Sequence, residues 1–163
     1  HRADMHIHFS LRRLALAGVP VHLMTDAALP GWMGQADLLL VGADAVMQTG
    51  VANKTGTEPL AQAARRARVP AYVLADSSKW LPPALATFWR TREEAPGQIA
   101  HRRHPNVRIH NRYFDRSPLP LFAGVVWEEG VAAPPEVRRR LARFETAAAL
   151  IALLERRPAD RRR

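Results

Sequence analysis

The chain is 163 residues long and contains no cysteine. These residues therefore cannot supply a disulfide, a thiolate metal site or a cysteine nucleophile. No apolar run approaches the roughly 18 residues that a membrane-spanning helix requires, and the sequence shows no secretory signal. Hydrophobic residues make up 47% and charged residues 24%, which is ordinary for a globular domain. We therefore expect a domain of a cytoplasmic protein with a core of its own and no contact with membranes.

Acidic residues are scarce relative to basic ones. The sequence has 24 lysines and arginines against 15 acidic residues, which gives a formal net charge of +9. From Pro134 onward nine arginines stand against four acidic residues, so this segment carries +5 of the total. A solvated, arginine-rich helix face is the favoured explanation, and contact with nucleic acid (RNA) or an acidic partner is the less favoured alternative.

Several motifs of catalysis and cofactor binding are also absent. There is no Gly-x-Ser-x-Gly nucleophile turn, no Walker phosphate loop and no dinucleotide-binding Gly-x-Gly-x-x-Gly. His6 and His8 lie two residues apart without a third ligand nearby, while His101, His104 and His110 lie in a basic, loop-like region. Solvated or hydrogen-bonded roles are favoured over zinc ligation for these histidines. We expect no metal and no cofactor.

Apolar segments of strand length alternate with helical patterns along the chain. This alternation predicts an α/β fold, with a doubly wound, mostly parallel sheet and helices on both of its faces. The continuous apolar run Leu38–Val41 is typical of a strand that is covered on both sides. Strands are expected at Val19–Asp26, Leu38–Val41, Val69–Asp76, Val107–His110 and Phe122–Trp127.

Helical patterns fall between these strands. They cover Ser10–Gly18, Thr57–Arg68, a short segment Pro82–Trp89 and a long segment Pro135–Arg157, while residues 91–103 have the composition of a polar loop. In the long segment, apolar residues recur at spacings of three and four, which predicts one long amphipathic helix. Docking of this helix on its own domain is favoured over a free, partner-binding role. Because doubly wound domains usually begin with a strand, we also expect that a strand or a whole domain precedes His1.

The segment after Leu38–Val41 carries the strongest candidate site. Gly42 and Asp44 follow the strand directly, and ligands of open α/β sheets bind beyond the carboxyl ends of the strands. A glycine at position 42 would let the chain turn tightly and approach a ligand closely. Asp44 is either a ligand-facing carboxylate or a loop cap, and the local pattern supports both equally. For Asp26 and Asp76, which end two other expected strands, a capping role is favoured.

The loop Gly50–Thr57 is a candidate anion-binding cradle. Thr55 is placed to cap the next helix, and Glu58 three residues later completes a capping-box pattern. Unpaired amides at the start of that helix would then face an anion, with the helix dipole and Lys54 adding positive charge. Lys79 is a second candidate cation, equally well explained as a surface lysine. The arrangement suits a small phosphorylated ligand.

Six segments, in order along the chain, share a pattern with known proteins. They are Val19–Asp26, Gly42-Ala43-Asp44-Ala45-Val46, Asn53-Lys54-Thr55-Gly56-Thr57, Val69–Asp76 with Lys79, Asn111–Pro118 and Glu128–Val131. Together they resemble one superfamily, which contains the regulatory subunits of translation initiation factor 2B, ribose-1,5-bisphosphate isomerase and methylthioribose-1-phosphate isomerase. The resemblance spans about residues 10–131.

The resemblance implies a Rossmann-like domain that forms homodimers or larger homo-oligomers. In the isomerases of the superfamily, a sugar phosphate opens to its chain form and a proton moves between C1 and C2, with a cysteine and an aspartate as the catalytic pair. Asp44 stands at the position of that aspartate, and Asn53 and Lys54 match positions that line the sugar-phosphate site. The other residues expected to bind the phosphorylated pentose are Gly42, Thr55, Gly56, Thr57 and Lys79.

Because the chain has no cysteine, two functional hypotheses remain. The leading hypothesis is a sugar-phosphate-binding, isomerase-like domain for aldose–ketose isomerisation of a ribose-1-phosphate derivative, with Asp44 as acid–base group. The catalytic cysteine would then lie in a preceding part of the protein. The alternative is a non-catalytic regulatory or interaction subunit related to initiation factor 2B. We expect residues 1–131 to form the Rossmann-like domain and residues 132–163 a helical extension with an arginine-rich end.

Overall fold

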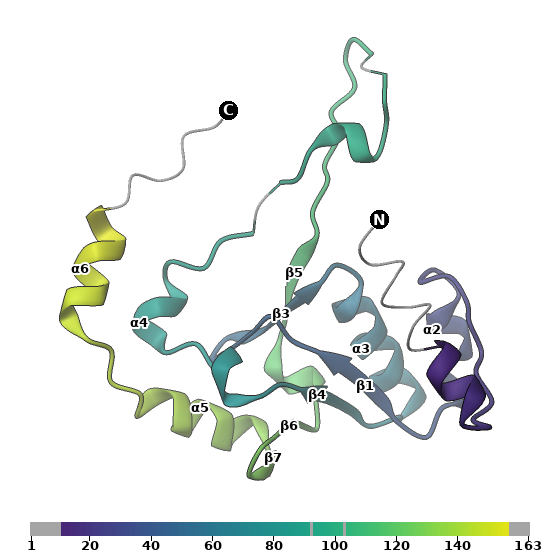
Figure 1. Ribbon diagram of the computed structural model, residues 1–163, viewed down its shortest axis with the longest axis horizontal. Helices are drawn as coiled ribbons and strands as arrows, with labels where there is room; N and C mark the ends of the chain where they lie inside the picture. The colour runs from purple at the N-terminus through teal and green to yellow at the C-terminus, as the bar shows by residue number, and fades with distance from the viewer. Residues whose placement is uncertain (1–10, 92, 103, 157–163) are drawn as a thin grey trace.

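The computed structural model describes residues 11–91, 93–102 and 104–156 (Figure 1). Its larger sheet has the strand order β1-β4-β6-β7. The first three of these strands run parallel, and β7 returns antiparallel to β6. Their bounds are β1 (Leu39–Gly42), β4 (Ala71–Leu74), β6 (Gly124–Trp127) and β7 (Gly130–Ala132). The expected α/β fold with a mostly parallel sheet is confirmed.

A second sheet, which the sequence patterns did not indicate, is antiparallel throughout. It has the order β2-β3-β5, with β2 (Ala45–Met47), β3 (Gly50–Lys54) and β5 (Phe114–Ser117). Val46 and Val51 lie opposite each other in this sheet and are fully buried. The chain therefore leaves the parallel sheet after β1, forms a hairpin that packs into the same core, and then enters the next helix.

The helix α3 (Thr57–Ala67) confirms the pattern found in the sequence. Ala61 and Ala64, three residues apart, are fully buried on its apolar face. The helix ends at Arg68, which has a left-handed φ of 60°, and Pro70 follows soon after. Shorter helical elements are residues 11–16, α2 (Leu29–Trp32), η1 (Met33–Gln35), η2 (Ser77–Lys79), α4 (Pro83–Ala86), η3 (Pro96–Gln98) and η4 (Leu119–Leu121).

One hydrophobic core lies between the larger sheet and the helices α3 and α5 (Pro134–Ala142). Val73 from β4 and Val125 from β6 are almost completely buried there. From α5, Val137 and Leu141 are fully buried in the same core. The chain after residue 132 therefore contributes to the packing of the sheet.

The opposite face of the larger sheet is exposed, in contrast to the expected helices on both faces. Leu40, Leu74 and Val131 are 51%, 54% and 59% exposed. Through the strand register they share this face with Tyr72 and Val126. No helix in the described ranges covers these three side chains. The continuous apolar run of β1 therefore does not reflect coverage on both sides here.

Two predicted strands are wrong. Val19–Asp26 is irregular and mostly exposed, although it has the apolar composition of a strand. Val107–His110 is irregular as well, and the nearby strand is β5, which begins at Phe114. A strand needs a partner for its backbone hydrogen bonds, and neither segment pairs with a strand of either sheet in the described part of the molecule.

The predicted long helix Pro135–Arg157 is divided. After α5 ends, residues 143–147 are not helical, and α6 (Ala148–Arg156) follows. No residue of α6 is buried, and in Figure 1 this helix lies well away from the sheets. Thr146, a β-branched residue between the two helices, has a low helix propensity. The last predicted residue, Arg157, lies outside the described residues.

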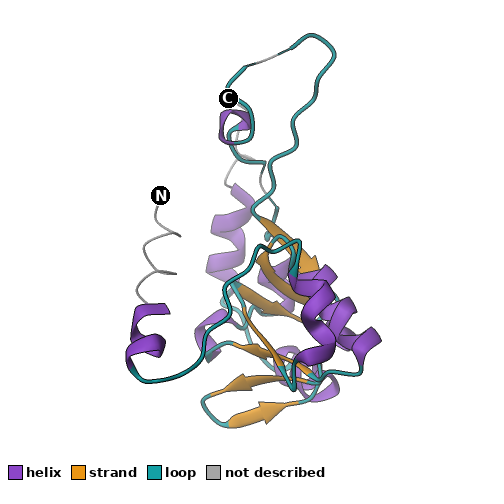
Figure 2. Cartoon of the chain, turned by 90° about the vertical axis from the view of Figure 1, so that its right-hand side faces the viewer, coloured by secondary structure: helices purple, strands orange, loops and turns teal. Residues whose placement is uncertain are grey.

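A long loop projects from the domain between α4 and β5. It rises above the sheets in both views (Figures 1 and 2) and includes the short turn η3. Its base is held by Glu93, which accepts hydrogen bonds from the amide of Asn111 at 2.9 Å and from the guanidinium of Arg112 at 2.9 Å. Among the residues described, no helix is long and apolar enough to cross a membrane.

Candidate functional site

Three acidic residues stand at or beyond the carboxyl ends of the parallel strands. Asp44 follows β1, Asp76 follows β4 and Glu128 follows β6. Because β1, β4 and β6 are neighbours and run in one direction, these residues lie along the same edge of the sheet. This is the edge at which open α/β sheets bind ligands.

Asp44 is exposed and is anchored through its backbone. Its amide donates a 2.9 Å hydrogen bond to the carbonyl of Ala52 in β3. This bond places Asp44 next to Asn53, the following residue of β3. The two side-chain types predicted for the sugar-phosphate site thus come from adjacent backbone positions, with the Asp44 carboxylate open to solvent.

Gly42 does not need to be glycine for the backbone. Its φ is not positive, and a Cβ atom at this position would meet no other atom within 4 Å. The chain therefore leaves β1 at Gly42 without a left-handed φ. The open space next to it is compatible with the other expectation, that a ligand approaches the chain here.

Asn53 and Thr57 form a local hydrogen-bond network at the start of α3. The Asn53 amide nitrogen donates to the Thr57 hydroxyl at 3.0 Å, and that hydroxyl donates to the carbonyl of Lys54 at 2.7 Å. Thr57 is buried and Asn53 is half-buried. Both predicted site residues therefore fix the turn from β3 into α3.

The predicted helix cap is wrong. The N-cap of α3 is Gly56, with a left-handed φ of 106°, and no side chain caps the helix. Thr55 instead donates its hydroxyl to the carbonyl of Arg112 at 2.7 Å. The Glu58 carboxylate accepts a hydrogen bond from Gln62, so it does not complete a capping box. A positive φ at position 56 favours glycine, which explains why this residue and not Thr55 occupies the cap.

Asp115 occupies part of the predicted anion cradle. Its carboxylate accepts a 3.2 Å hydrogen bond from the Gly56 amide, and in the sheet it pairs with Asn53. Burial raises the pKa of Asp115, and the Gly56 hydrogen bond only partly opposes this effect. One amide of the cradle is thus already bound to a carboxylate. The helix itself supplies no acceptors for the next two amides, those of Thr57 and Glu58.

Lys54 points away from this network. Neighbouring residues of a strand project to opposite faces, so Lys54 lies on the other side of β3 from Asn53. Its ammonium is 3.8 Å from the centre of the Phe114 ring and 5.2 Å from that of Tyr113. Lys54 is exposed, so its long side chain is free to reorient. In the free protein, the structure does not bring Lys54 to the amides at the start of α3.

Lys79 and Asp76 lie together beyond β4. The Asp76 carboxylate caps η2 by accepting from the amide of Ser78 at 2.9 Å and from the Ser78 hydroxyl. These bonds, with a smaller effect of the Lys79 charge, lower the pKa of Asp76. The favoured capping role of Asp76 is confirmed. Lys79 is half-exposed at the end of η2.

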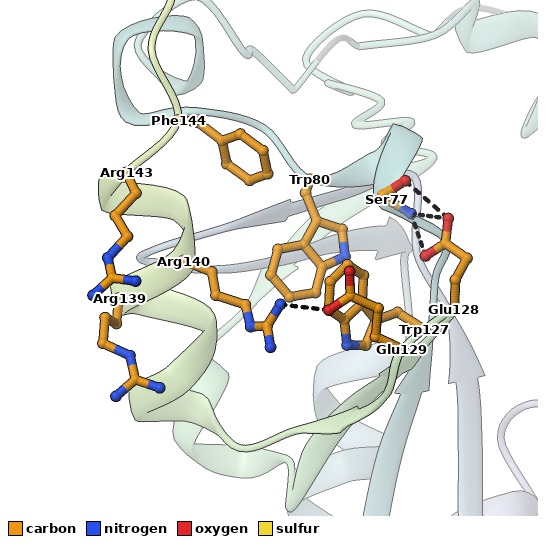
Figure 3. Close-up of a pocket in the computed structure, with 9 residues that line it drawn as sticks. All are labelled: Ser77, Trp80, Trp127, Glu128, Glu129, Arg139, Arg140, Arg143 and Phe144. Atoms are coloured by element: carbon orange, nitrogen blue, oxygen red, sulfur yellow. Dashed lines mark hydrogen bonds and ion pairs between the residues drawn. The ribbon is translucent and has the colours of Figure 1, made fainter.

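The acidic residue that the sequence reasoning missed is Glu128. Its carboxylate accepts hydrogen bonds from the amide and the hydroxyl of Ser77, and these bonds lower its pKa. Glu128 lines a pocket of about 660 Å³ between the edge of the sheet and α5 (Figure 3). Its position directly after a strand, like that of Asp44, is the signal by which it could have been found. Asp115 gives no such signal, because it lies within an antiparallel strand.

No group of three or more potential metal ligands is present in residues 11–91, 93–102 and 104–156. The histidine pair His6 and His8 lies outside these ranges. His110 is 3.5 Å from the Glu93 carboxylate at the base of the projecting loop. The histidines that the structure describes are therefore not gathered in a metal centre.

The fold and the acidic loop after β1 define a mixed α/β domain with its candidate site at the carboxyl edge of a mostly parallel sheet. The model of the Initiation factor 2 subunit family matches residues 7–134, and the chain belongs to this family.

The similar proteins include enzymes and initiation factors. The chain is 34% identical over 137 residues to ribose 1,5-bisphosphate isomerase from Archaeoglobus fulgidus, covering 80% of this chain and 42% of that protein. It is 37% identical over 131 residues to methylthioribose-1-phosphate isomerase from Chloroflexus aurantiacus, covering 75% and 38%. It is 32% identical over 127 residues to a putative translation initiation factor eIF-2B subunit 2-like protein from Pyrococcus horikoshii, covering 76% and 43%.

The similar solved structures also include an initiation factor subunit and an isomerase. The subunit delta of translation initiation factor eIF-2B from A. fulgidus has a TM-score of 0.68 and 29% identity, covering 79% of this chain and 41% of that chain. The 5-methylthioribose 1-phosphate isomerase from P. horikoshii has a TM-score of 0.65 and 29% identity, covering 78% and 39%. The chain thus spans about two fifths of the length of these relatives.

Proposed function

We propose that this chain is the sugar-phosphate-binding domain of an isomerase-like protein that converts a ribose-1-phosphate derivative from aldose to ketose. The observation that carries the proposal is the exposed carboxylate of Asp44. The backbone amide of Asp44 donates a 2.9 Å hydrogen bond to the carbonyl of Ala52, which places Asp44 beside Asn53. The similarity to two named sugar-phosphate isomerases supports it.

The reaction needs a proton to move between two carbon atoms of the open-chain sugar. A base removes the proton from C2, a C1=C2 double bond forms, and the bond from C1 to the ring oxygen breaks as that oxygen gains a proton, so C1 keeps its phosphate. C1 is then protonated while the C2 hydroxyl loses its proton, which leaves the ketone at C2. Asp44 is proposed as one acid–base group of this transfer. The second group comes from outside these 163 residues, because the superfamily uses a cysteine and the chain has none.

The phosphate group is proposed to lie at the start of α3. The amides of Thr57 and Glu58 point out of the first turn, where the helix dipole favours an anion. Lys54 would leave the Phe114 ring to reach the phosphate, and Lys79 would supply a second charge from the end of η2. Gly42 and Asn53 would line the sugar. Asp115 limits how close the phosphate approaches Gly56, since it already accepts that amide.

Calorimetric titration with ribose-1,5-bisphosphate and ribose-1-phosphate tests this proposal. We expect binding by the wild-type chain and weaker binding by Lys54→Ala, with Arg66→Ala on the far part of α3 as a matched loss of one positive charge. Asp44→Asn should retain binding, because it keeps the shape of the side chain. Absence of heat from either ligand at millimolar concentration, in wild type and variants alike, would contradict the proposed site.

A second candidate function is a regulatory subunit that uses the same fold for assembly, as a homodimer or larger homo-oligomer. Two observations favour it: the chain lacks cysteine, and its similar proteins include initiation factor subunits. Turnover of a ribose phosphate by the complete protein would exclude a purely regulatory role. Ligand binding without turnover by the complete protein would favour it.

A further inference from the structure

A second pocket lies between α4 and the antiparallel sheet, beside the turn that joins β2 to β3. The turn residues Gln48 and Thr49 form one side of it, α4 and Arg90 form another, and Arg116 of β5 contributes to the lining. Its volume of about 330 Å³ is near the lower end of the range of small-molecule sites. The turn precedes β3, whereas Asn53 and Lys54 are the last two residues of that strand, so this pocket is separate from the site proposed for the sugar phosphate.

The lining of this pocket carries positive charge without a counter-charge. Arg90 and Arg116 contribute to it, and no acidic residue does. In the part of the chain that the structure describes, neither arginine forms an ion pair. Asp115 is next to Arg116 in β5 but projects to the opposite face of the strand, where it accepts the Gly56 amide. The two positive charges are therefore not compensated by the protein.

The helix nearest to the turn adds no negative charge. Arg138 of α5 donates from its Nε to the carbonyl of Gln48 at 3.3 Å, and the Gln48 side chain donates to the carbonyl of Arg138 at 3.0 Å. Glu136, the acidic residue of α5, lies 2.9 Å from the Arg140 guanidinium. Like charges gathered around one pocket repel one another and attract an anion.

Neutral groups hold the two guanidiniums in place. Arg116 lies 5.4 Å from the centre of the Trp89 ring and donates from Nη1 to the Thr49 hydroxyl at 3.4 Å. Arg90 donates from Nη1 to the carbonyls of Thr87 and Trp89, just after α4. A ring, a hydroxyl and two carbonyls orient these side chains but do not cancel their charges. Arginine has five N–H donors, so each guanidinium keeps donors for a ligand.

We propose that this pocket binds a phosphate group, either inorganic phosphate or the phosphate of a small monoester. Arg90 and Arg116 donate to the phosphate oxygens, and the Thr49 hydroxyl, which accepts from Arg116, donates its own hydrogen. A phosphate with nearly two negative charges matches two guanidiniums, whose planar forks suit its oxygens. The organic part of a monoester would lie against Pro83 and Ala86. The site does not depend on the proposed isomerase function, because it uses none of the residues assigned to that reaction.

Nuclear magnetic resonance of the backbone amides tests the proposal. The full chain, labelled with ¹⁵N, is titrated with sodium phosphate at neutral pH and constant ionic strength. We expect saturable shifts of the Thr49 and Gly50 amide signals. Arg90→Gln and Arg116→Gln should each weaken binding about tenfold, which corresponds to about 1.4 kcal/mol. Both arginines are exposed, so the variants should fold, and the dispersion of their amide signals checks this.

Two ligands distinguish the possible sources of the phosphate group. Glycerol 1-phosphate that binds more tightly than inorganic phosphate, and also shifts the Ala86 amide, would identify a monoester as the ligand. Equal affinities would identify inorganic phosphate. Acetate has one charge, and succinate has two charges on separate carboxylates, so both should bind more weakly than phosphate.

The position of the site is controlled by a variant elsewhere. Arg66→Gln removes one exposed positive charge from α3, outside the pocket, and should leave phosphate binding unchanged. Equal binding of acetate or succinate, an unshifted Thr49 signal, or undiminished affinity in either arginine variant of the pocket would overturn the proposal. Phosphate-induced shifts confined to residues 56–58 would also overturn it, while leaving the proposed sugar-phosphate site intact.

Discussion

The backbone and the side chain of Ser77 both donate hydrogen bonds to Glu128, and these bonds tie the ends of two neighbouring parallel strands together. The Ser77 amide lies 2.9 and 3.0 Å from the two carboxylate oxygens, and the hydroxyl lies 2.8 Å from one of them. Ser77 follows β4 and Glu128 follows β6, so the Glu128 side chain links the carboxyl ends of these two strands. Both residues also line the pocket between this edge of the sheet and α5.

Glu128→Gln should flatten the acid side of the stability profile. The Ser77 amide lowers the pKa of Glu128 in the folded chain. The stability that the carboxylate contributes is therefore present above the pKa of the unfolded chain and lost as pH falls through the lower folded pKa. Urea unfolding at neutral and acid pH measures this: the variant should be less stable at neutral pH and equal to wild type in acid. Glu155→Gln, on the exposed helix α6, is the control, and an equal effect there would contradict the assignment.

Asp115→Asn should be as stable as wild type or more stable at neutral pH. Burial raises the pKa of Asp115, so the folded chain loses stability as pH rises from the unfolded pKa through the higher folded pKa. Asparagine removes the buried charge and keeps an oxygen for the Gly56 amide. Asp115→Ala removes that acceptor and should cost about 1 kcal/mol. Denaturant midpoints near neutral pH compare the two variants, and a larger loss in Asp115→Asn than in Asp115→Ala would contradict this prediction.

Ser117→Ala should be neutral or stabilising. Ser117 is fully buried in β5, and its hydroxyl has no hydrogen-bond partner among the described residues. Removing an unsatisfied buried hydroxyl should gain up to about 1 kcal/mol, provided that the space left by one oxygen atom closes. Thermal unfolding is the measurement. A clear loss of stability would show that the hydroxyl has a partner in solution, such as a bound water molecule.

Two glycines should respond differently to alanine. A Cβ atom at Gly50 would lie 2.5 Å from the carbonyl oxygen of Ser117, so Gly50→Ala should destabilise by about 1–3 kcal/mol. At Gly42 a Cβ atom would meet nothing within 4 Å, and Gly42→Ala should change stability by less than about 0.5 kcal/mol. Unfolding curves and calorimetry with ribose-1-phosphate separate folding from binding. If Gly42 contacts the sugar as proposed, Gly42→Ala should weaken binding while the protein stays folded, and unchanged binding would remove Gly42 from the site.

The elements that could be predicted are those specified by local sequence. The apolar strand around Val73 and the alanine-rich face of α3 were identified because burial at adjacent positions leaves a periodic pattern. The strand expected at Val19–Asp26 was wrong because apolar composition does not reveal whether a sheet edge is available. The division between α5 and α6 was missed because the apolar spacing continues through residues 143–147.

The candidate site was predictable only in part, because some of its contacts join residues that are far apart in the sequence. Asp44 follows a strand and a glycine, which is a local signal. The partner of the Gly56 amide is Asp115, 59 residues further along the chain, and no spacing rule connects them. The direction of Lys54 follows from strand alternation once β3 is known, but the β2–β3 hairpin was not anticipated. Contacts between antiparallel strands thus determine which predicted ligand groups actually meet.

The uncovered face of the larger sheet should affect how the protein associates in solution. Leu40 on the edge strand β1, Leu74 on β4 and Val131 on the opposite edge strand β7 expose hydrocarbon on one face of the sheet, and exposed apolar surface next to open sheet edges promotes association between molecules. The net charge of +9 opposes this by repulsion, but added salt shortens the reach of that repulsion from about 10 Å at 0.1 M to about 3 Å at 1 M. The isolated chain should therefore remain monomeric best in buffer of low ionic strength, and its light scattering should increase as salt is added. Scattering that does not depend on salt would show that this face is shielded in solution.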